Sequence, residues 1–258
     1  MPTSEAPLVP ISAKFMSTNT GLQVLPLAIL PGLLCDSRMY GAQLAAFPQA
    51  VVIDGFYGGA RSLEAMAEIA LKQLPGRFAL VGHSMGGRIA LEIMRREPER
   101  AAALVLADTG VHPVQPGEAD KRLALRDIGR SQGIAALVDA WLPPMIAPDR
   151  RCDAALVEPL TAMCVAAGLA TYEAQIEALL SRPDAADVLP AIACPTLVIT
   201  GAQDSWASPA QHEAIAAAIP GAELVVVPGA GHMLPTEDPA AFNAAVAALL
   251  EQADRGQS

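Results

Sequence analysis

The chain has 258 residues, of which 52% are hydrophobic, 4% are aromatic and 17% are charged. It therefore has ample apolar surface for a packed core, which excludes an intrinsically disordered protein. Seventeen Lys and Arg residues against 27 Asp and Glu residues give a net charge of −10, which argues against a nucleic-acid binder and against attraction to an anionic membrane. We expect a small neutral or apolar partner instead.

The beginning of the chain and its cysteines indicate a cytoplasmic protein. The first residues contain neither a basic segment nor an uninterrupted apolar one, so no secretory signal is predicted. The most apolar run, 25–34, is broken by two prolines and is shorter than the roughly 20 residues that a membrane span needs. The cysteines lack CxxC spacing, and we expect reduced thiols and no membrane insertion.

Short apolar runs alternate with helical patterns along much of the chain. Strands are predicted at 27–30, 51–53, 78–81 and 104–107, with helices at 37–47, 62–74 and 85–96 between them. Two further strands are predicted at 196–200 and 223–227, with helices at 211–219 and 239–252. Continuous apolar strands that alternate with helices indicate a parallel sheet covered on both faces. Residues 1–24 hold few strand signals, so a β-hairpin there stays an open question.

Residues 110–190 interrupt this alternation with helical periodicity and no convincing strand. We therefore expect an α/β core formed by residues 1–109 and 191–258, with 110–190 inserted as a helical cap. Ligands of such sheets bind at the carboxyl ends of the strands. A segment that leaves from that edge is well placed to act as a lid.

The segment 82-GHSMGG-87 follows a predicted strand and precedes a predicted helix, which is the context of a G-x-S-x-G nucleophile turn. Ser84 is then the candidate nucleophile and needs a base to take its proton. His232 lies in a Gly-rich loop after a strand, and Asp204 follows another strand, so both are expected at the same sheet edge. Asp108, also directly after a strand, is the alternative acid, and His212 is expected on a helix surface.

Four motifs carry a resemblance to a known family, namely 30-LPGLLCD-36, 82-GHSMGG-87, 201-GAQDSWASP-209 and 229-GAGHMLPTEDP-239. Over residues 25–252 the chain resembles the α/β-hydrolase superfamily, and it looks closest to small-cap bacterial carboxylesterases such as the pimeloyl-ester carboxylesterases. The resemblance implies an α/β-hydrolase fold with a mostly parallel sheet, a triad of Ser84, Asp204 and His232, and no cofactor. It also assigns the oxyanion hole to the backbone N–H groups of Leu33 and Met85.

Six residues are candidates for the substrate pocket: Trp141, Leu142, Met145, Met163, Trp206 and Met233. The alternative is that those within 110–190 only pack this segment onto the core. A charged run is expected to form a solvated helix face, with an Arg that pairs with a substrate carboxylate as the alternative; it comprises Asp120, Lys121, Arg122, Arg126, Asp127 and Arg130.

The function that these features favour is a serine carboxylesterase that hydrolyses small neutral or hydrophobic esters through an acyl-enzyme. The same residues also suit a hydrolase of carbon–carbon bonds in ring-cleavage diketones, a lactonase or an amidase. A ligand receptor built on a hydrolase fold is the alternative from another class. The histidines and cysteines lack metal-ligand spacing, so no metal is expected. The sequence does not predict an oligomeric state.

Overall fold

The computed structural model describes residues 25–255, so the question of a hairpin in residues 1–24 lies outside the described residues. Its strands form one six-stranded sheet in the order β2-β1-β3-β4-β5-β6, and each neighbouring pair is parallel. This confirms the parallel sheet predicted from the sequence. The strands are β1 (Leu27–Leu30), β2 (Ala50–Val52), β3 (Phe78–His83), β4 (Ala101–Ala107), β5 (Thr196–Gly201) and β6 (Glu223–Val227).

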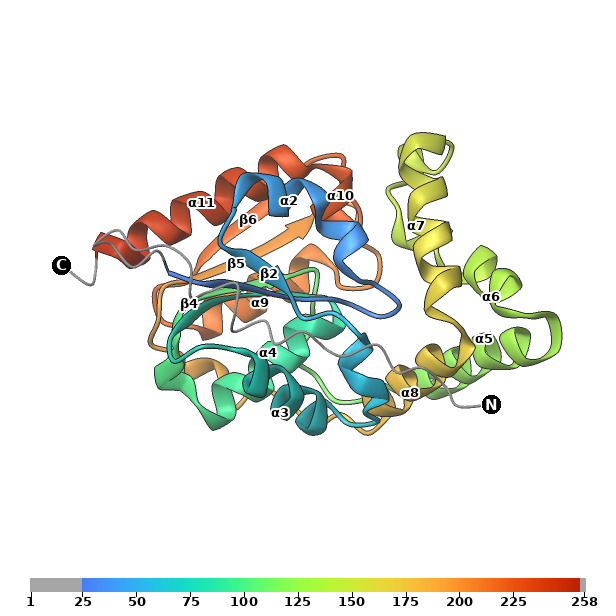
Figure 1. Cartoon of the computed structure of the whole chain (residues 1–258), viewed down its shortest axis with the longest axis horizontal. Helices are drawn as coiled ribbons and strands as arrows, with labels where there is room; N and C mark the ends of the chain where they lie inside the picture. Colours follow the sequence, from blue (N-terminus) through green and yellow to red (C-terminus); the bar gives the residue numbers. More distant parts are fainter. Residues whose placement is uncertain (1–24, 256–258) are drawn as a thin grey trace, which may run out of the picture.

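Helices cover both faces of the sheet (Figure 1). On one face lie α2 (Gly41–Ala46) and α11 (Pro239–Arg255), and on the other lie α3 (Leu63–Gln73), α4 (Met85–Arg96) and α9 (Pro209–Ala218). Strands β1 to β5 are therefore buried along their whole length, which explains their continuous apolar sequence. The edge strand β6 differs, because Leu224 and Val226 are each 37% exposed.

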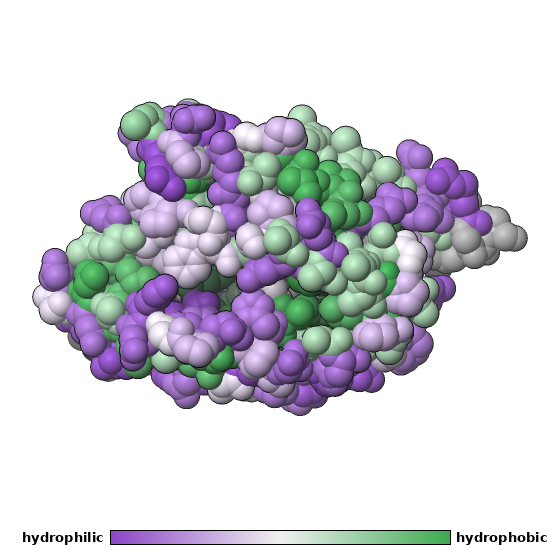
Figure 2. All heavy atoms as spheres, turned by 180° about the vertical axis from the view of Figure 1, so that it is seen from behind, coloured by the Kyte–Doolittle hydropathy of each residue, from purple (hydrophilic) through white to green (hydrophobic). Residues whose placement is uncertain are grey.

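The surface seen from behind is mixed in character. Figure 2 shows hydrophilic and hydrophobic side chains interspersed over most of this face, with groups of hydrophobic residues near its upper edge and toward its left end. Scattered exposed apolar residues are ordinary on a folded protein. They do not by themselves locate a functional site.

Local sequence signals explain most element boundaries. Helix α3 begins after Ser62, whose Oγ accepts the N–H of Ala65 at 3.2 Å, and it ends just before Pro75. The helix predicted over 37–47 is divided into a 3-10 helix (Ser37–Tyr40) and α2. Strand β4 begins at Ala101, earlier than predicted, because three consecutive alanines carry little strand propensity. The short helix α10 (Leu234–Glu237) was not expected.

Four helices occupy the 110–190 segment between β4 and β5, namely α5 (Glu118–Gln132), α6 (Ile134–Trp141), α7 (Ala154–Ala167) and α8 (Leu169–Leu180). In Figure 1, α5, α6 and α7 stack beside one end of the sheet, and α8 leads back toward it. Helix α8 also contacts the core directly, since Gln175 Oε1 accepts the N–H of Leu34 at 2.9 Å. Within residues 25–255 no single helix is long and apolar enough to cross a membrane; α7 and α8 pass that test only as a pair bent by 86°.

Candidate active site

Ser84 occupies the sharp turn between β3 and α4 in a backbone conformation that is costly for a residue with a Cβ, with φ 55° and ψ −116°. Its N–H donates to the carbonyl of Ala107 at 2.9 Å, and Thr109 Oγ1 donates to the Ser84 carbonyl at 2.7 Å. Only glycine fits two residues further on, because a Cβ on Gly86 would overlap the carbonyl oxygen of Leu30. The surrounding backbone therefore holds Ser84 in this strained geometry.

A continuous hydrogen-bonded relay joins Ser84, His232 and Asp204. The Ser84 hydroxyl lies 2.8 Å from His232 Nε2, and His232 Nδ1 lies 2.7 Å from Asp204 Oδ2. Because a carboxylate only accepts, Nδ1 carries the proton and Nε2 accepts from the serine hydroxyl. The second Asp204 oxygen accepts the backbone N–H groups of Trp206 and Ala207 at 2.8 and 2.9 Å. Burial raises the pKa of Asp204, but the His232 interaction and these N–H groups outweigh it, so the pKa lies below its usual value.

His232 is also held through its backbone, by hydrogen bonds that the sequence did not predict. His83 Nε2–H donates to the His232 carbonyl at 2.8 Å, and the His232 N–H donates to the carbonyl of Met145 at 2.8 Å. Burial, and then the nearby His232 ring, lower the pKa of His83 to about 3, so His83 is neutral. Glu237 Oε1 accepts the N–H of Met233 at 3.0 Å and fixes the same loop. Both His83 and Glu237 fall inside the family motifs.

Asp108, the alternative acid, lies in a different environment. It is fully buried, and its Oδ1 accepts the Thr200 hydroxyl at 3.1 Å and the Gly201 N–H at 3.0 Å. Burial, and next the charge of Asp204, raise the pKa of Asp108 well above its ordinary value. The carboxylate that meets the His232 ring is therefore that of Asp204.

The expectation that His212 lies on a helix surface is wrong. Its side chain is fully buried, and its Nε2 accepts the N–H of Thr109 at 3.0 Å, while Nδ1–H donates to the Ser208 carbonyl at 3.1 Å. His212 therefore anchors the segment that follows Asp108. Its partner is distant in sequence, so no local pattern marks this role.

A pocket of about 370 Å³ opens above Ser84, a size typical of small-molecule sites. Three of the six residues predicted to line it do so, namely Trp141, Met145 and Trp206. The other three are packed in the hydrophobic core instead, each 1% exposed: Leu142, Met163 and Met233. Apolar residues that pack this region and apolar residues that line the pocket give the same sequence pattern. The sequence alone therefore does not distinguish the two sets.

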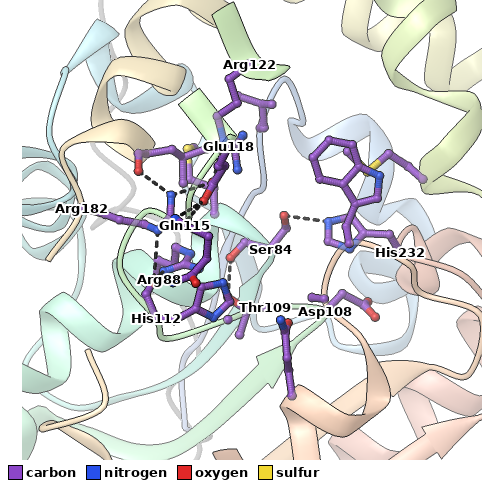
Figure 3. Close-up of a pocket in the computed structure, with 18 of the residues that line it drawn as sticks. Ser84, Arg88, Asp108, Thr109, His112, Gln115, Glu118, Arg122, Arg182 and His232 are labelled. Carbon is purple, nitrogen blue, oxygen red and sulfur yellow. Dashed lines mark hydrogen bonds and ion pairs between the residues drawn. The ribbon is translucent and has the colours of Figure 1, made fainter. Parts of the chain in front are cut away.

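The opposite side of the pocket is charged (Figure 3). Ser84 lies between His232 on one side and a group formed by Arg88, Glu118, Arg122 and Arg182 on the other. We call this group, together with Lys121, the charged wall. Lys121 and Arg122, which the sequence places on a solvated helix face, both line the pocket. Lys121 is exposed as expected, whereas Arg122 is only partly exposed, so the expectation is wrong for Arg122.

Glu118 is the centre of the charged wall. Its two oxygens accept from Arg182 Nη2 and Nη1 at 2.6 and 2.8 Å, and Arg122 Nε donates to Glu118 Oε1 at 2.9 Å. Burial alone would raise the pKa of Glu118. The hydrogen bonds from Arg182 and the other nearby donors outweigh burial and lower the pKa to about 2. Glu118 is therefore ionised and neutralises part of the cationic charge around it.

The loop after β1 lies beside Ser84 and brings a second backbone donor to the pocket. Both Leu33 and Met85 line the pocket, and within residues 25–255 neither backbone N–H has a hydrogen-bond acceptor. Pro31 and Gly32 directly precede Leu33 in this loop. Here the Pro31 carbonyl accepts the hydroxyl of Tyr57 at 3.0 Å, which together with the Gln175–Leu34 bond fixes the loop.

The cysteines of the described chain are free thiols, two of them buried (Cys35 and Cys164). In residues 25–255 no group of three or more His, Cys, Asp or Glu side chains is arranged to hold a metal ion. Burial raises the pKa of the Cys164 thiol to about 12 and, by desolvation, that of Cys35 as well. Both buried thiols are therefore protonated at neutral pH and are poor nucleophiles.

A parallel sheet with a strained serine between β3 and α4 is the arrangement of an α/β hydrolase. The model of the Alpha/beta hydrolase family matches residues 29–245. The chain belongs to this family and is a hydrolase, which confirms the resemblance found in the sequence.

Several known proteins are similar to this chain. It is 31% identical to the putative carbamate hydrolase RutD of Klebsiella pneumoniae over 70% of each chain. It is 27% identical to the pimeloyl-[acyl-carrier protein] methyl ester esterase of Yersinia enterocolitica over 76% of this chain and 78% of that protein. A malate-bound thermophilic esterase from Thermogutta terrifontis has 30% identity and a TM-score of 0.78 over 89% of this chain and 90% of that one. A 34% identical match to the polyketide synthase ThaQ of Burkholderia thailandensis spans only 9% of that protein.

Proposed function

We propose that the protein is a serine carboxylesterase that works through an acyl-enzyme. The observation that carries this proposal is the relay of 2.8 and 2.7 Å contacts from Ser84 through His232 to Asp204. Ser84 Oγ attacks the ester carbonyl while His232 Nε2 takes its proton, and the carboxylate of Asp204 stabilises the resulting imidazolium. His232 then protonates the departing alcohol. A water molecule, activated by His232, releases the carboxylic acid and regenerates Ser84.

We assign stabilisation of the tetrahedral oxyanion to the backbone N–H groups of Leu33 and Met85. Their lack of another acceptor supports this role, since both donors remain available to a ligand. Met85 is the first residue of α4, so the positive end of the helix dipole adds to the same stabilisation. Loss of one oxyanion donor typically lowers kcat by about 10²–10³-fold.

We further propose that residues 110–190 form a helical cap over the core of residues 1–109 and 191–258. Support comes from the pocket lining, because Trp141 and Met145 reach it from α6 and the turn after it, and the charged wall reaches it from α5. The apolar side, with Trp206, suits the small neutral or hydrophobic esters expected from the sequence. The charged wall does not suit them.

Cleavage of a carbamate or a lactone by the same relay is the second candidate. The 31% identity to a putative carbamate hydrolase favours it, as does the 26% identity to the enol-lactonase from Burkholderia xenovorans, with a TM-score of 0.76. Ester cleavage stands first because two of the similar proteins are esterases, one of them the 30% identical thermophilic esterase.

The test is hydrolysis of p-nitrophenyl esters from acetate to decanoate by the wild-type protein, by Ser84→Ala and by Ser181→Ala. Ser181 is an exposed serine at the end of α8 and serves as the matched control. We expect Ser84→Ala to lower kcat by about 10⁴–10⁶-fold and Ser181→Ala to leave it unchanged. Equal rates in wild type and Ser84→Ala would refute the proposal. If every ester is inert, carbamates and lactones are the next substrates.

A further inference from the structure

Within residues 25–255, one arginine of the charged wall has no carboxylate partner. Arg182 and Arg122 share Glu118, whereas Arg88 Nη1 donates only to the carbonyl of His112, at 3.0 Å. Within residues 25–255 Arg88 makes no ion pair. The Nε and Nη2 groups of its guanidinium therefore remain free to bind a ligand.

This arrangement leaves an excess of positive charge at the pocket of an acidic protein. Four cationic side chains line it against two acids, Asp108 and Glu118, so the cations outnumber the acids even when both carboxyls are ionised. Burial, and then the charge of Arg182, lower the pKa of Arg88 to about 9, so its guanidinium is still charged at neutral pH. Arg88 is only partly exposed, and a partly buried charge without a counter-ion is stabilised when a ligand supplies one.

Arg88 lies where it can contact a second group of a substrate whose ester carbonyl is at Ser84. Ser84 is the N-cap of α4 and Arg88 lies one helical turn later, which is about 6 Å along the axis. Gly110 leaves room beside the guanidinium, since a Cβ there would lie 3.0 Å from Arg88 Nη2. The planar N–H pair of a guanidinium matches the two oxygens of a carboxylate.

We propose that Arg88 binds a carboxylate that the substrate carries in addition to its ester, so that the favoured substrates are half-esters of short dicarboxylic acids. This inference rests on the proposed esterase function and names its substrate class. It replaces the expectation of a neutral substrate, because the local charge at the pocket, rather than the net charge of −10, acts on the bound ligand.

The experiment measures kcat/KM for the monomethyl esters of succinate, glutarate and adipate, each against its dimethyl ester. The dimethyl ester has the same carbon chain with the anion masked, and its turnover reports whether a variant is folded. We expect Arg88→Gln to lower the ratio of monoester to diester kcat/KM by roughly 10–100-fold, mainly through KM. Arg96→Gln is the matched control, since Arg96 lies at the far end of the same helix and pairs with Glu68 at 3.0 Å.

The outcomes separate this inference from the proposed function. An equal ratio in wild type and Arg88→Gln, with hydrolysis that still requires Ser84, overturns the inference and leaves the esterase proposal standing. If neither ester is hydrolysed, calorimetry with Ser84→Ala and monomethyl glutarate decides. Binding that is lost on adding Arg88→Gln supports the carboxylate site, and absent or unchanged binding overturns it.

Discussion

The two sides of the pocket are built in different ways. The His232 side consists of short loops at the carboxyl ends of β3, β5 and β6, where neutral His83 and the buried Glu237 hold the backbone in place. The opposite side is a charged wall contributed largely by α5 and α8 of the 110–190 segment and the turns that flank them. The Ser84–His232–Asp204 relay is therefore held by the ends of the sheet, while most of the charge around Arg88 comes from the 110–190 segment.

The largest expected effect tests which carboxylate, that of Asp204 or that of Asp108, orients the His232 ring. Asp204→Asn removes the carboxylate that fixes the His232 tautomer, and we expect kcat for p-nitrophenyl butyrate to fall by about 10⁴-fold. Asp108→Asn is the matched control. Burial raises the pKa of the Asp108 carboxyl, and an amide oxygen can accept the same hydrogen bonds from Thr200 and Gly201, so we expect a loss of less than about 10-fold. The reverse order of losses would make Asp108 the acid.

The next effect concerns His83 and the dependence of stability on pH. The folded pKa of His83 is about 3, against about 6.5 in an unfolded chain. Below pH 6.5 the unfolded chain therefore binds a proton that the folded chain does not, and stability falls as the pH falls from about 6.5 to about 3. At 1.36 kcal/mol per pKa unit this loss is at most about 5 kcal/mol.

His83→Gln keeps an N–H donor for the His232 carbonyl but cannot titrate. We expect its free energy of unfolding to depend less on pH than that of the wild type between pH 6.5 and 3, measured by urea denaturation. His112→Gln is the control, since His112 is only partly buried and its pKa is lowered less. Parallel curves for wild type and His83→Gln would show that His83 is charged in the folded protein.

The smallest effect tests whether the 110–190 segment also supports the reacting side. Gln175→Leu leaves the buried N–H of Leu34 without an acceptor, which we expect to lower the free energy of unfolding by about 1–3 kcal/mol. It should also lower kcat, because the loop that carries Leu33 is released. Gln132→Leu, an exposed change in α5, should alter neither quantity. A normal kcat in Gln175→Leu would mean that the 110–190 segment does not support the reacting side of the pocket.

The sequence predicted the elements whose signals are local. Continuous apolar strands identified the parallel sheet, and the strand–Gly-rich turn–helix pattern located Ser84. Asp204 and His232 follow strands of a parallel sheet, and such strand ends meet at one edge. Short-range patterns therefore predicted the positions of the relay residues.

The features that were missed depend on contacts between distant parts of the chain. His212 looked like a helix-surface residue because its partner, Thr109, is 103 positions away. Arg122 looked solvated because helical periodicity identifies a polar face without indicating whether water or a pocket adjoins it. Met163 looked like a pocket residue because packing and lining require the same apolar side chains. Tertiary packing decides each of these cases.

Helix α4 has a consequence for the length of the substrates that fit the pocket. It begins directly after Ser84 and carries Arg88 one turn later, so the backbone positions of the two residues belong to one helix. The helix therefore fixes the separation of these two positions, while the guanidinium itself is also held by the carbonyl of His112. If Arg88 binds the substrate carboxylate as proposed, the length of one helical turn then sets which half-esters reach both groups at once.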